Sequence, residues 1–130
     1  MPQHIALVSL LVRDYDEAID FYCHKLGFRL VEDTQQGPKR WVVVAPQGDS
    51  GSALLLARAS NNQQQDMIGQ QGAGRVWLFL QTNDFAGDYQ RMSAAGVQFQ
   101  EQPRAEAYGT VAVFADLYGN LWDLIERKQH

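Results

Sequence analysis

One stretch decides the fold: residues 11–28, with the sequence LVRDYDEAIDFYCHKLGF. Asp14 can cap a helix, and Glu17, three residues later, can complete a capping box. The apolar side chains around and after them recur at helical spacing, namely Tyr15, Ala18, Ile19, Tyr22 and Leu26. Gly27 stands where a left-handed residue commonly ends a helix. The sequence therefore predicts a helix from about Tyr15 to Lys25.

Strands are predicted on both sides of this helix. Before it, Ile5 to Val12 is an apolar run rich in β-forming residues. After it, three segments have the composition of strands and are separated by turn residues: Phe28 to Asp33, Arg40 to Ala45 and Ser52 to Ala59. The predicted order of the first half is β-α-β-β-β.

The second half repeats this order after a polar, glycine-rich segment. Residues 60–74 are predicted to be a linker, with a short helix around Gln64 to Ile68. Arg75 to Thr82 is the next predicted strand, and Asp84 can cap a second helix that ends at Gly96. Three more predicted strands follow, at Val97 to Gln100, Thr110 to Ala115 and Asn120 to Glu126.

The two halves can be aligned by residue. The caps Asp14 and Asp84 correspond, and so do the glycines that end the helices and the pair Gly51 and Gly119. We therefore predict an α+β fold of two tandem βαβββ modules in one domain of residues 1–130. The predicted boundaries are about 4–59 for module 1, 60–74 for the linker and about 75–127 for module 2. An unrelated α+β sheet is the alternative.

Composition narrows the classes of partner and compartment. The 130 residues carry a net charge of -4 and no basic run, which argues against a nucleic acid partner. The single cysteine, Cys23, cannot form an internal disulfide, and the start of the chain lacks the pattern of a signal peptide. No apolar run approaches the roughly 20 residues that span a bilayer. A cytoplasmic protein without membrane partners is expected.

Two stretches resemble one protein family. Residues 12–22 and 26–28 look like the first-module signature, and FADLYGNLWDLIE at 114–126 looks like the second-module ending, of the vicinal oxygen chelate superfamily. This superfamily includes glyoxalases, bleomycin-resistance proteins and extradiol dioxygenases. The resemblance implies half-barrel sheets around a cleft for a small molecule. It also implies pairing of modules, so a symmetric homodimer is expected.

In the enzymes of this family a divalent metal is held by the first and fourth strands of each half. Carried over by position, the four ligand slots are Leu7, Leu55, Trp77 and Asp123. Only Asp123 offers a lone pair, whereas a metal site usually needs at least about two or three protein ligands. No metal cofactor is therefore expected. The alternative is a divalent metal held by unusual ligands, for instance His4 with Asp123.

Strand alternation predicts which side chains line the cleft. The predicted ligand-binding residues on the strands are Leu7, Ser9, Leu55, Trp77, Phe79, Gln81, Leu121 and Asp123. Arg40 and Tyr108 are expected at the cleft mouth. The alternative is that the apolar members fill a sealed core between the halves.

Asp123 is the most informative of these residues. A lone carboxylate in an apolar cleft is costly, so it needs a partner, water or a proton. It can pair with an arginine, with Arg40, Arg58, Arg75 and Arg104 as candidates. It can instead bind a cationic or hydroxylated ligand, or act as a catalytic general base.

The sequence leaves the function open between three classes. The leading prediction is a small-molecule-binding protein of this superfamily without the family's metal centre. The alternative is a lyase, isomerase or dioxygenase-type enzyme acting on a small oxygenated substrate. The third class is an interaction subunit with a filled cleft. A nucleophilic pair of Cys23 and His24 is not expected, since adjacent helix residues do not face each other.

Overall fold

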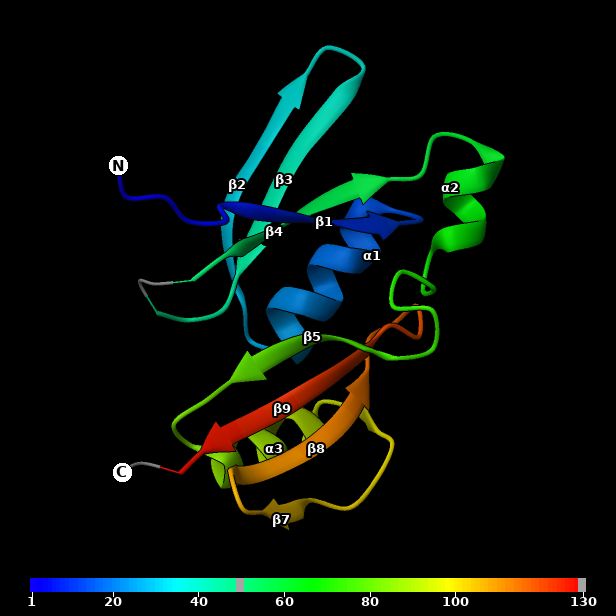
Figure 1. Cartoon of the computed structure of the whole chain (residues 1–130). Coiled ribbons are helices and arrows are strands. Elements are labelled where there is room, and N and C mark those ends of the chain that lie inside the picture. The colour runs from blue at the N-terminus through cyan, green and yellow to red at the C-terminus, as the bar shows by residue number, and fades with distance from the viewer. Residues whose placement is uncertain (49–50, 129–130) are drawn as a thin grey trace. The chain divides into compact units, whose positions relative to one another are not determined.

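The computed structural model describes residues 1–48 and 51–128 (Figure 1). The chain divides into two compact units, Met1–Ile68 and Gly69–His130, called here the first and the second unit. Their boundary falls inside the segment 60–74. Each unit contains one sheet, of four and five strands respectively, with helices beside it. The predicted α+β class with two sheets is confirmed.

The first unit follows the predicted order and ends with a short helix, close to the one predicted around Gln64 to Ile68. Its elements are β1 (Leu7–Val12), α1 (Tyr15–Ile19), η1 (Asp20–Lys25), β2 (Arg29–Gln36), β3 (Lys39–Ala45), β4 (Ala53–Arg58) and α2 (Asn62–Met67). The sheet order is β1-β4-β3-β2. The β1–β4 pair is parallel, and the other pairs are antiparallel.

The helix of the first unit begins as predicted but changes character halfway. The Asp14 carboxylate accepts a hydrogen bond from the Glu17 backbone N–H at 2.9 Å, which is the predicted cap. The second half, η1, is a π-helix rather than a continuation of the α-helix. Gly27 then adopts the left-handed conformation at φ 84° and ends the helix.

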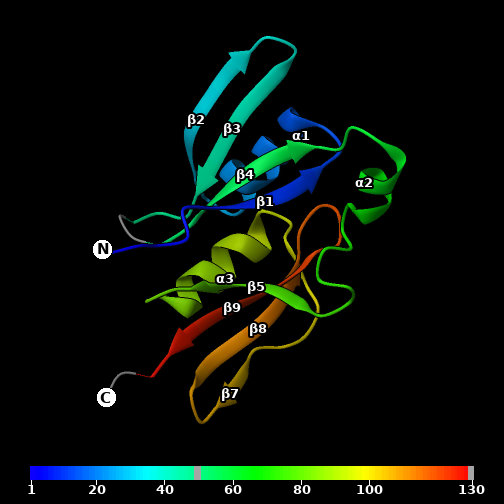
Figure 2. The same cartoon turned by 45° about the horizontal axis from the view of Figure 1, so that its top comes forward.

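The helix covers one face of the first sheet (Figure 1, Figure 2). The strand residues of this face are at most 6% exposed: Leu10, Val12, Val42, Val44, Leu54 and Leu56. Ala18, Phe21 and Tyr22 supply buried side chains from the helix. We call the opposite face, which carries the alternate strand residues, the far face of the first sheet.

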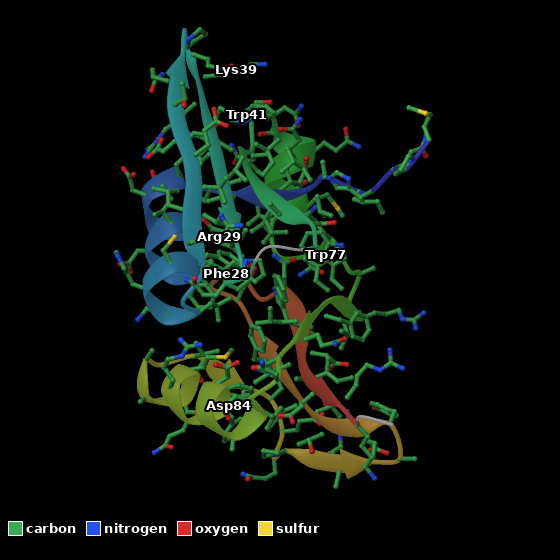
Figure 3. The ribbon with its side chains drawn as sticks, turned by 90° about the vertical axis from the view of Figure 1, so that its left-hand side faces the viewer. Phe28, Arg29, Lys39, Trp41, Trp77 and Asp84 are labelled. Carbon is green, nitrogen blue, oxygen red and sulfur yellow. The ribbon has the colours of Figure 1, made fainter. Side chains whose placement is uncertain are left out.

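Strand β2 is the outer strand of this sheet, and all eight of its residues are exposed. Leu30 pairs with Val44, but the next pair is Glu32 with Val43, so Val31 is an extra residue that forms a β-bulge. The β2–β3 hairpin reaches well past β1 and β4, with Lys39 near its tip (Figure 1, Figure 3).

The second unit repeats the order with one strand more. Its elements are β5 (Val76–Gln81), α3 (Phe85–Ala94), β6 (Gln98–Phe99), β7 (Arg104–Glu106), β8 (Gly109–Ala115) and β9 (Leu121–Arg127). The order β5-β9-β8-β6 matches that of the first sheet, and β7 also pairs with β8. The short polar strand β7 was not predicted from the sequence.

Aromatic side chains join α3 to one face of the second sheet. Tyr89 of α3 packs on Phe99 with ring centroids 4.4 Å apart, Phe99 packs on Phe114 at 5.7 Å, and Phe114 stacks on Trp122 at 5.8 Å. The predicted cap is present, because the Gly87 N–H donates to the Asp84 carboxylate at 3.1 Å. We call the face opposite α3 the far face of the second sheet.

The turn between β8 and β9 is held by one buried carboxylate. Asp116 Oδ1 accepts the backbone N–H groups of Tyr118 and Asn120, each at 2.9 Å. Its Oδ2 accepts the Asn120 side-chain amide, also at 2.9 Å. Both Asp116 and Asn120 are buried. This turn fixes the start of β9 and thereby the position of Asp123.

Within residues 1–48 and 51–128, no helix has the length and apolar character needed to cross a bilayer.

Candidate functional site

Asp123 lies on the far face of the second sheet. Its neighbours along β9, Trp122 and Leu124, are buried on the face toward α3, so alternation turns Asp123 the other way. Asp123 pairs with Phe79 on β5 and with Val113 on β8. Directly paired residues of adjacent strands share a face, so these three side chains form one row.

The row around Asp123 combines a buried carboxylate oxygen with an exposed aromatic ring. Phe79 is 65% exposed, which is unusual for a phenylalanine. Leu121 and Ile125, two residues before and after Asp123 on β9, are half-buried on the same face. This part of the far face of the second sheet is therefore largely apolar, with the Asp123 carboxylate among the apolar side chains.

One oxygen of the Asp123 carboxylate is not satisfied within the part of the chain that the structure describes. Its Oδ1 atom is buried and has no hydrogen-bond partner there. Burial raises the pKa of Asp123; the nearby Arg104 guanidinium lowers this pKa, and Glu101 raises it. Burial outweighs the arginine, so the net shift is upward. An unpaired buried carboxylate needs a donor, and a bound ligand can supply one.

Arg104 is the candidate partner of Asp123 that the structure brings near it, but it is bound elsewhere. Arg104 Nε lies 2.5 Å from Glu101 Oε2, and its Nη1 lies 2.7 Å from Glu106 Oε1. These two carboxylates raise the pKa of Arg104, Glu101 being the larger cause. The spacing Glu101-x-x-Arg104-x-Glu106 was the available sequence signal for this network, and sequence reasoning missed it.

Trp77 occupies an irregular position on β5. Val76 pairs with Leu121 but Leu78 pairs with Trp122, so Trp77 is an extra residue between them. The backbone before β5 packs closely on it, since a Cβ added to Gly72 would lie 2.9 Å from Trp77 Cβ. Trp77 remains half-buried at the start of β5 (Figure 3). Gln81, further along β5, is exposed.

The predicted cleft residues of the first unit share the far face of its own sheet. Ser9 pairs with Leu55, and Leu55 pairs with Val43. Leu7 lies two residues before Ser9 on β1 and is 37% exposed. Trp41, two residues before Val43 on β3, is half-buried on the same face. Leu7, Ser9 and Leu55 thus lie together as alternation predicts.

Arg40 points to the opposite face, away from Leu7, Ser9 and Leu55. Its guanidinium donates to Asp33 at 2.7 and 2.8 Å and to Asp16 of α1 at 3.0 Å. It also lies over the Tyr15 ring, 5.5 Å from the centroid. The hydrogen bond from Arg40 lowers the pKa of Asp33. This position fits a link between the hairpin and the helix.

Tyr108 lies in the two-residue turn between β7 and β8 and is exposed. Its backbone carbonyl accepts a hydrogen bond from the Lys128 N–H at 2.9 Å. The turn follows Glu106, so Tyr108 is beside the Arg104 network in sequence.

The donor set does not fit the metal centre of the family. Leu7 and Leu55 have hydrocarbon side chains, and the Trp77 indole N–H is a donor only. Across residues 1–48 and 51–128, no group of three or more His, Cys, Asp and Glu side chains is arranged to hold a metal ion. His4 is exposed before β1, and His24 Nδ1 lies 2.9 Å from Asp20 Oδ1.

Comparisons with known proteins agree with this fold. The model of the Glyoxalase/Bleomycin resistance protein/Dioxygenase superfamily matches residues 3–124. An uncharacterized protein of Shewanella frigidimarina is 59% identical over 128 residues, which cover 97% of this chain and 95% of that protein. The chain therefore belongs to the glyoxalase/bleomycin resistance protein/dioxygenase superfamily.

Two solved structures show the same architecture. UcmS2 has a TM-score of 0.83 and 28% identity, covering 96% of this chain and 98% of its own. TnmS3, an antibiotic binding protein from Streptomyces sp. CB03234, has a TM-score of 0.80 and 30% identity, covering 98% of both chains. The similarity thus includes a protein that binds a small molecule.

Proposed function

We propose that this chain binds a small, largely apolar organic molecule without using a metal ion, and that Asp123 makes the central polar contact. The observation that carries the proposal is the buried Asp123 Oδ1, which has no hydrogen-bond partner among the described residues. The exposed Phe79 ring beside it offers a surface on which a planar ligand can pack.

The comparisons support binding as the activity. TnmS3 is an antibiotic binding protein that aligns with nearly the whole chain, so antibiotics are a suitable first ligand class to test. Ligand sites are commonly apolar with a few placed polar groups, and the row around Asp123 has this composition. Leu7, Ser9, Leu55, Trp77 and Gln81 remain predicted ligand-binding residues. The homodimer also remains a prediction.

The first expected result concerns the metal. Because Leu7, Leu55 and Trp77 offer no metal ligand, tag-free protein purified at neutral pH should contain far less than one transition metal ion per chain. Elemental analysis after dialysis measures this content. Added Zn²⁺, Mn²⁺ or Fe²⁺ should leave the melting temperature unchanged. About one dialysis-resistant ion per chain would overturn the metal-free proposal.

The second expected result concerns Asp123→Asn. A thermal-shift screen of aromatic molecules, polycyclic antibiotics included, identifies a ligand of the wild-type protein. The substitution should weaken the binding of this ligand by about 1.5–3 kcal/mol, the scale of a hydrogen bond to a charged group. The dissociation constant then rises roughly 10- to 150-fold, as calorimetry can measure. Asp66→Asn, at an exposed position of α2, is the charge-matched control.

The same substitution should not destabilise the protein. The pKa of Asp123 is raised by burial, so the contribution of this group to stability is most favourable below the ordinary Asp pKa of about 3.9. It falls as the pH rises through the raised value. Asp123→Asn should therefore keep or increase the melting temperature at pH 7, with no gain at strongly acidic pH. A large loss of stability with unchanged affinity would show that Asp123 is a structural residue.

A further inference from the structure

The charge around Asp123 has an unexpected feature. Arg104 is placed to neutralise Asp123, because it pairs with Val111, which pairs with Ile125, two residues from Asp123 on β9. These paired residues share the far face of the second sheet. Yet Asp123 Oδ1 is unpaired within the described residues, and the arginine is bound to two glutamates.

The two glutamates hold Arg104 from different positions. Glu101, in the loop before β7, receives Nε of the guanidinium through both of its carboxylate oxygens, at 3.2 and 2.5 Å. Glu106, at the end of β7, receives Nη1 at 2.7 Å. A planar guanidinium with two of its nitrogens bound in this way has lost most of its freedom to turn toward a third carboxylate.

We propose that Glu101 and Glu106 act as a clasp on Arg104, keeping its guanidinium from Asp123 so that the site selects ligands carrying a protonated amine. The clasp residues are specificity-determining residues, which act on the ligand through Arg104 and Asp123. This inference rests on the proposed function, since it assigns a ligand class to the same site.

The local charge explains the selection. Glu101 and Glu106 contact the Arg104 guanidinium and outweigh its charge, and Asp123 lies within its electrostatic reach, so the region is negative and becomes more so when Asp123 is ionised. A protonated amine on an aromatic scaffold can bond to Asp123 while its ring packs on Phe79. A carboxylate on the same scaffold meets like charge, and its binding is opposed. Because ionised Asp123 is required, cation binding should weaken on acidification through the Asp123 pKa.

The clasp can be opened without changing its shape. Glu101→Gln with Glu106→Gln removes both charges that hold Arg104 and keeps side chains of equal size. The freed guanidinium then competes for Asp123. Glu17→Gln is the matched control, because Glu17 of α1 holds Arg13, which precedes this helix, in a two-bond ion pair at 2.7 and 3.0 Å in the first unit.

Three probes with one ring system test the selection: 2-naphthylmethylammonium, 2-naphthylmethanol and 2-naphthylacetate. Calorimetry at pH 7 should show that the wild-type protein and Glu17→Gln prefer the cation over the alcohol and the alcohol over the anion. The open-clasp variant should bind the cation about tenfold more weakly, a loss of about 1.4 kcal/mol, and should lose its discrimination against the anion. Adding Arg104→Gln to that variant should restore the preference for the cation.

A second readout needs no ligand. Carbon NMR of the carboxyl groups follows the pKa of Asp123 in the wild-type protein, in Arg104→Gln, in the open-clasp variant and in the triple variant. Arg104→Gln should raise this pKa more in the open-clasp background than in the wild-type background, because only there does the guanidinium reach Asp123.

The two failures are distinguishable. Equal effects of Arg104→Gln in both backgrounds, or an unchanged cation preference in the open-clasp variant, would overturn the clasp while leaving small-molecule binding intact. If neither the naphthalene probes nor any screened molecule binds the wild-type protein, the proposed function is wrong, and with it the selection of amines.

Discussion

Replacing Phe114 with alanine should lower the free energy of unfolding by about 3–5 kcal/mol, the range for removing a large buried aromatic ring. Phe114 has 0% exposure and packs between Phe99 and Trp122, with centroids 5.7 and 5.8 Å away. The substitution would remove both ring contacts. The cavity left behind would lie where α3 meets the second sheet. Urea denaturation followed by tryptophan fluorescence and circular dichroism measures the loss.

The matched control lies on the other face of the same sheet. Phe79→Ala makes the same chemical change at a ring that is 65% exposed, so it should alter stability by no more than about 0.5 kcal/mol. Phe79→Ala should instead weaken the binding of the ligand that is found for the wild-type protein. A stability loss for Phe79→Ala comparable to that for Phe114→Ala would mean that Phe79 belongs to the core rather than to a binding surface.

Replacing Asp116 with alanine should lower the free energy of unfolding by about 2–4 kcal/mol, since buried donors lose their acceptor. The donors are the Tyr118 and Asn120 backbone N–H groups and the Asn120 side-chain amide. Because this turn begins β9, amide protons of β9 should also exchange faster in the variant. Thermal unfolding and hydrogen exchange followed by mass spectrometry test both effects.

Asp116→Asn is the informative companion variant. The side-chain oxygen of the new asparagine can still accept from the Tyr118 and Asn120 backbone N–H groups. The Asn120 Oδ1 atom, buried and without a partner in the described residues, can accept from the new amide if the Asn120 side chain turns over. The loss should therefore be less than half that of Asp116→Ala. Equal losses would show that the negative charge, and not the hydrogen-bond geometry, holds the turn.

Local signals carried most of the fold prediction. Asp14 and Asp84 cap the helices as their spacing predicted, and Gly27 and Gly96 adopt positive φ of 84° and 97° at the helix ends. These features depend on a few neighbouring residues, so a single sequence reveals them. The π-helix η1 and the strand β7 were missed. Strand β7 has three residues, largely polar and exposed, and thus no hydrophobic pattern to recognise.

The face of Arg40 could not be predicted for a related reason. Val42, Val43 and Val44 are all buried, so hydropathy shows no alternation along β3 from which to count. Only the register, with Val42 opposite Leu56 and Val43 opposite Leu55, separates the two faces. Counting back from Val42 then places Arg40 on the face toward α1, where Asp16 receives it.

The surroundings of Asp123 depend on which carboxylates bind Arg104, and the sequence alone does not reveal this. Arg104 had several carboxylates within reach, and the structure assigns it to Glu101 and Glu106. Both are local in sequence, at three residues before and two residues after, and local partners cost less chain ordering than distant ones. The position of Asp123 on β9 was predictable from the family resemblance, but the absence of a partner for its Oδ1 atom among the described residues was not.

The bulge at Val31 has a consequence for the behaviour of the protein at high concentration. An outer strand displays unpaired backbone groups that can recruit a strand of another molecule and seed aggregates. In β2 the apolar Leu30 and Val31, each 47% exposed, would make such recruitment favourable. The extra residue disturbs the even spacing of hydrogen bonds at this point, and charged Arg29 and Glu32 stand on either side. The bulge and the two flanking charges thus protect the exposed Leu30 and Val31 from pairing with strands of other molecules and from aggregation.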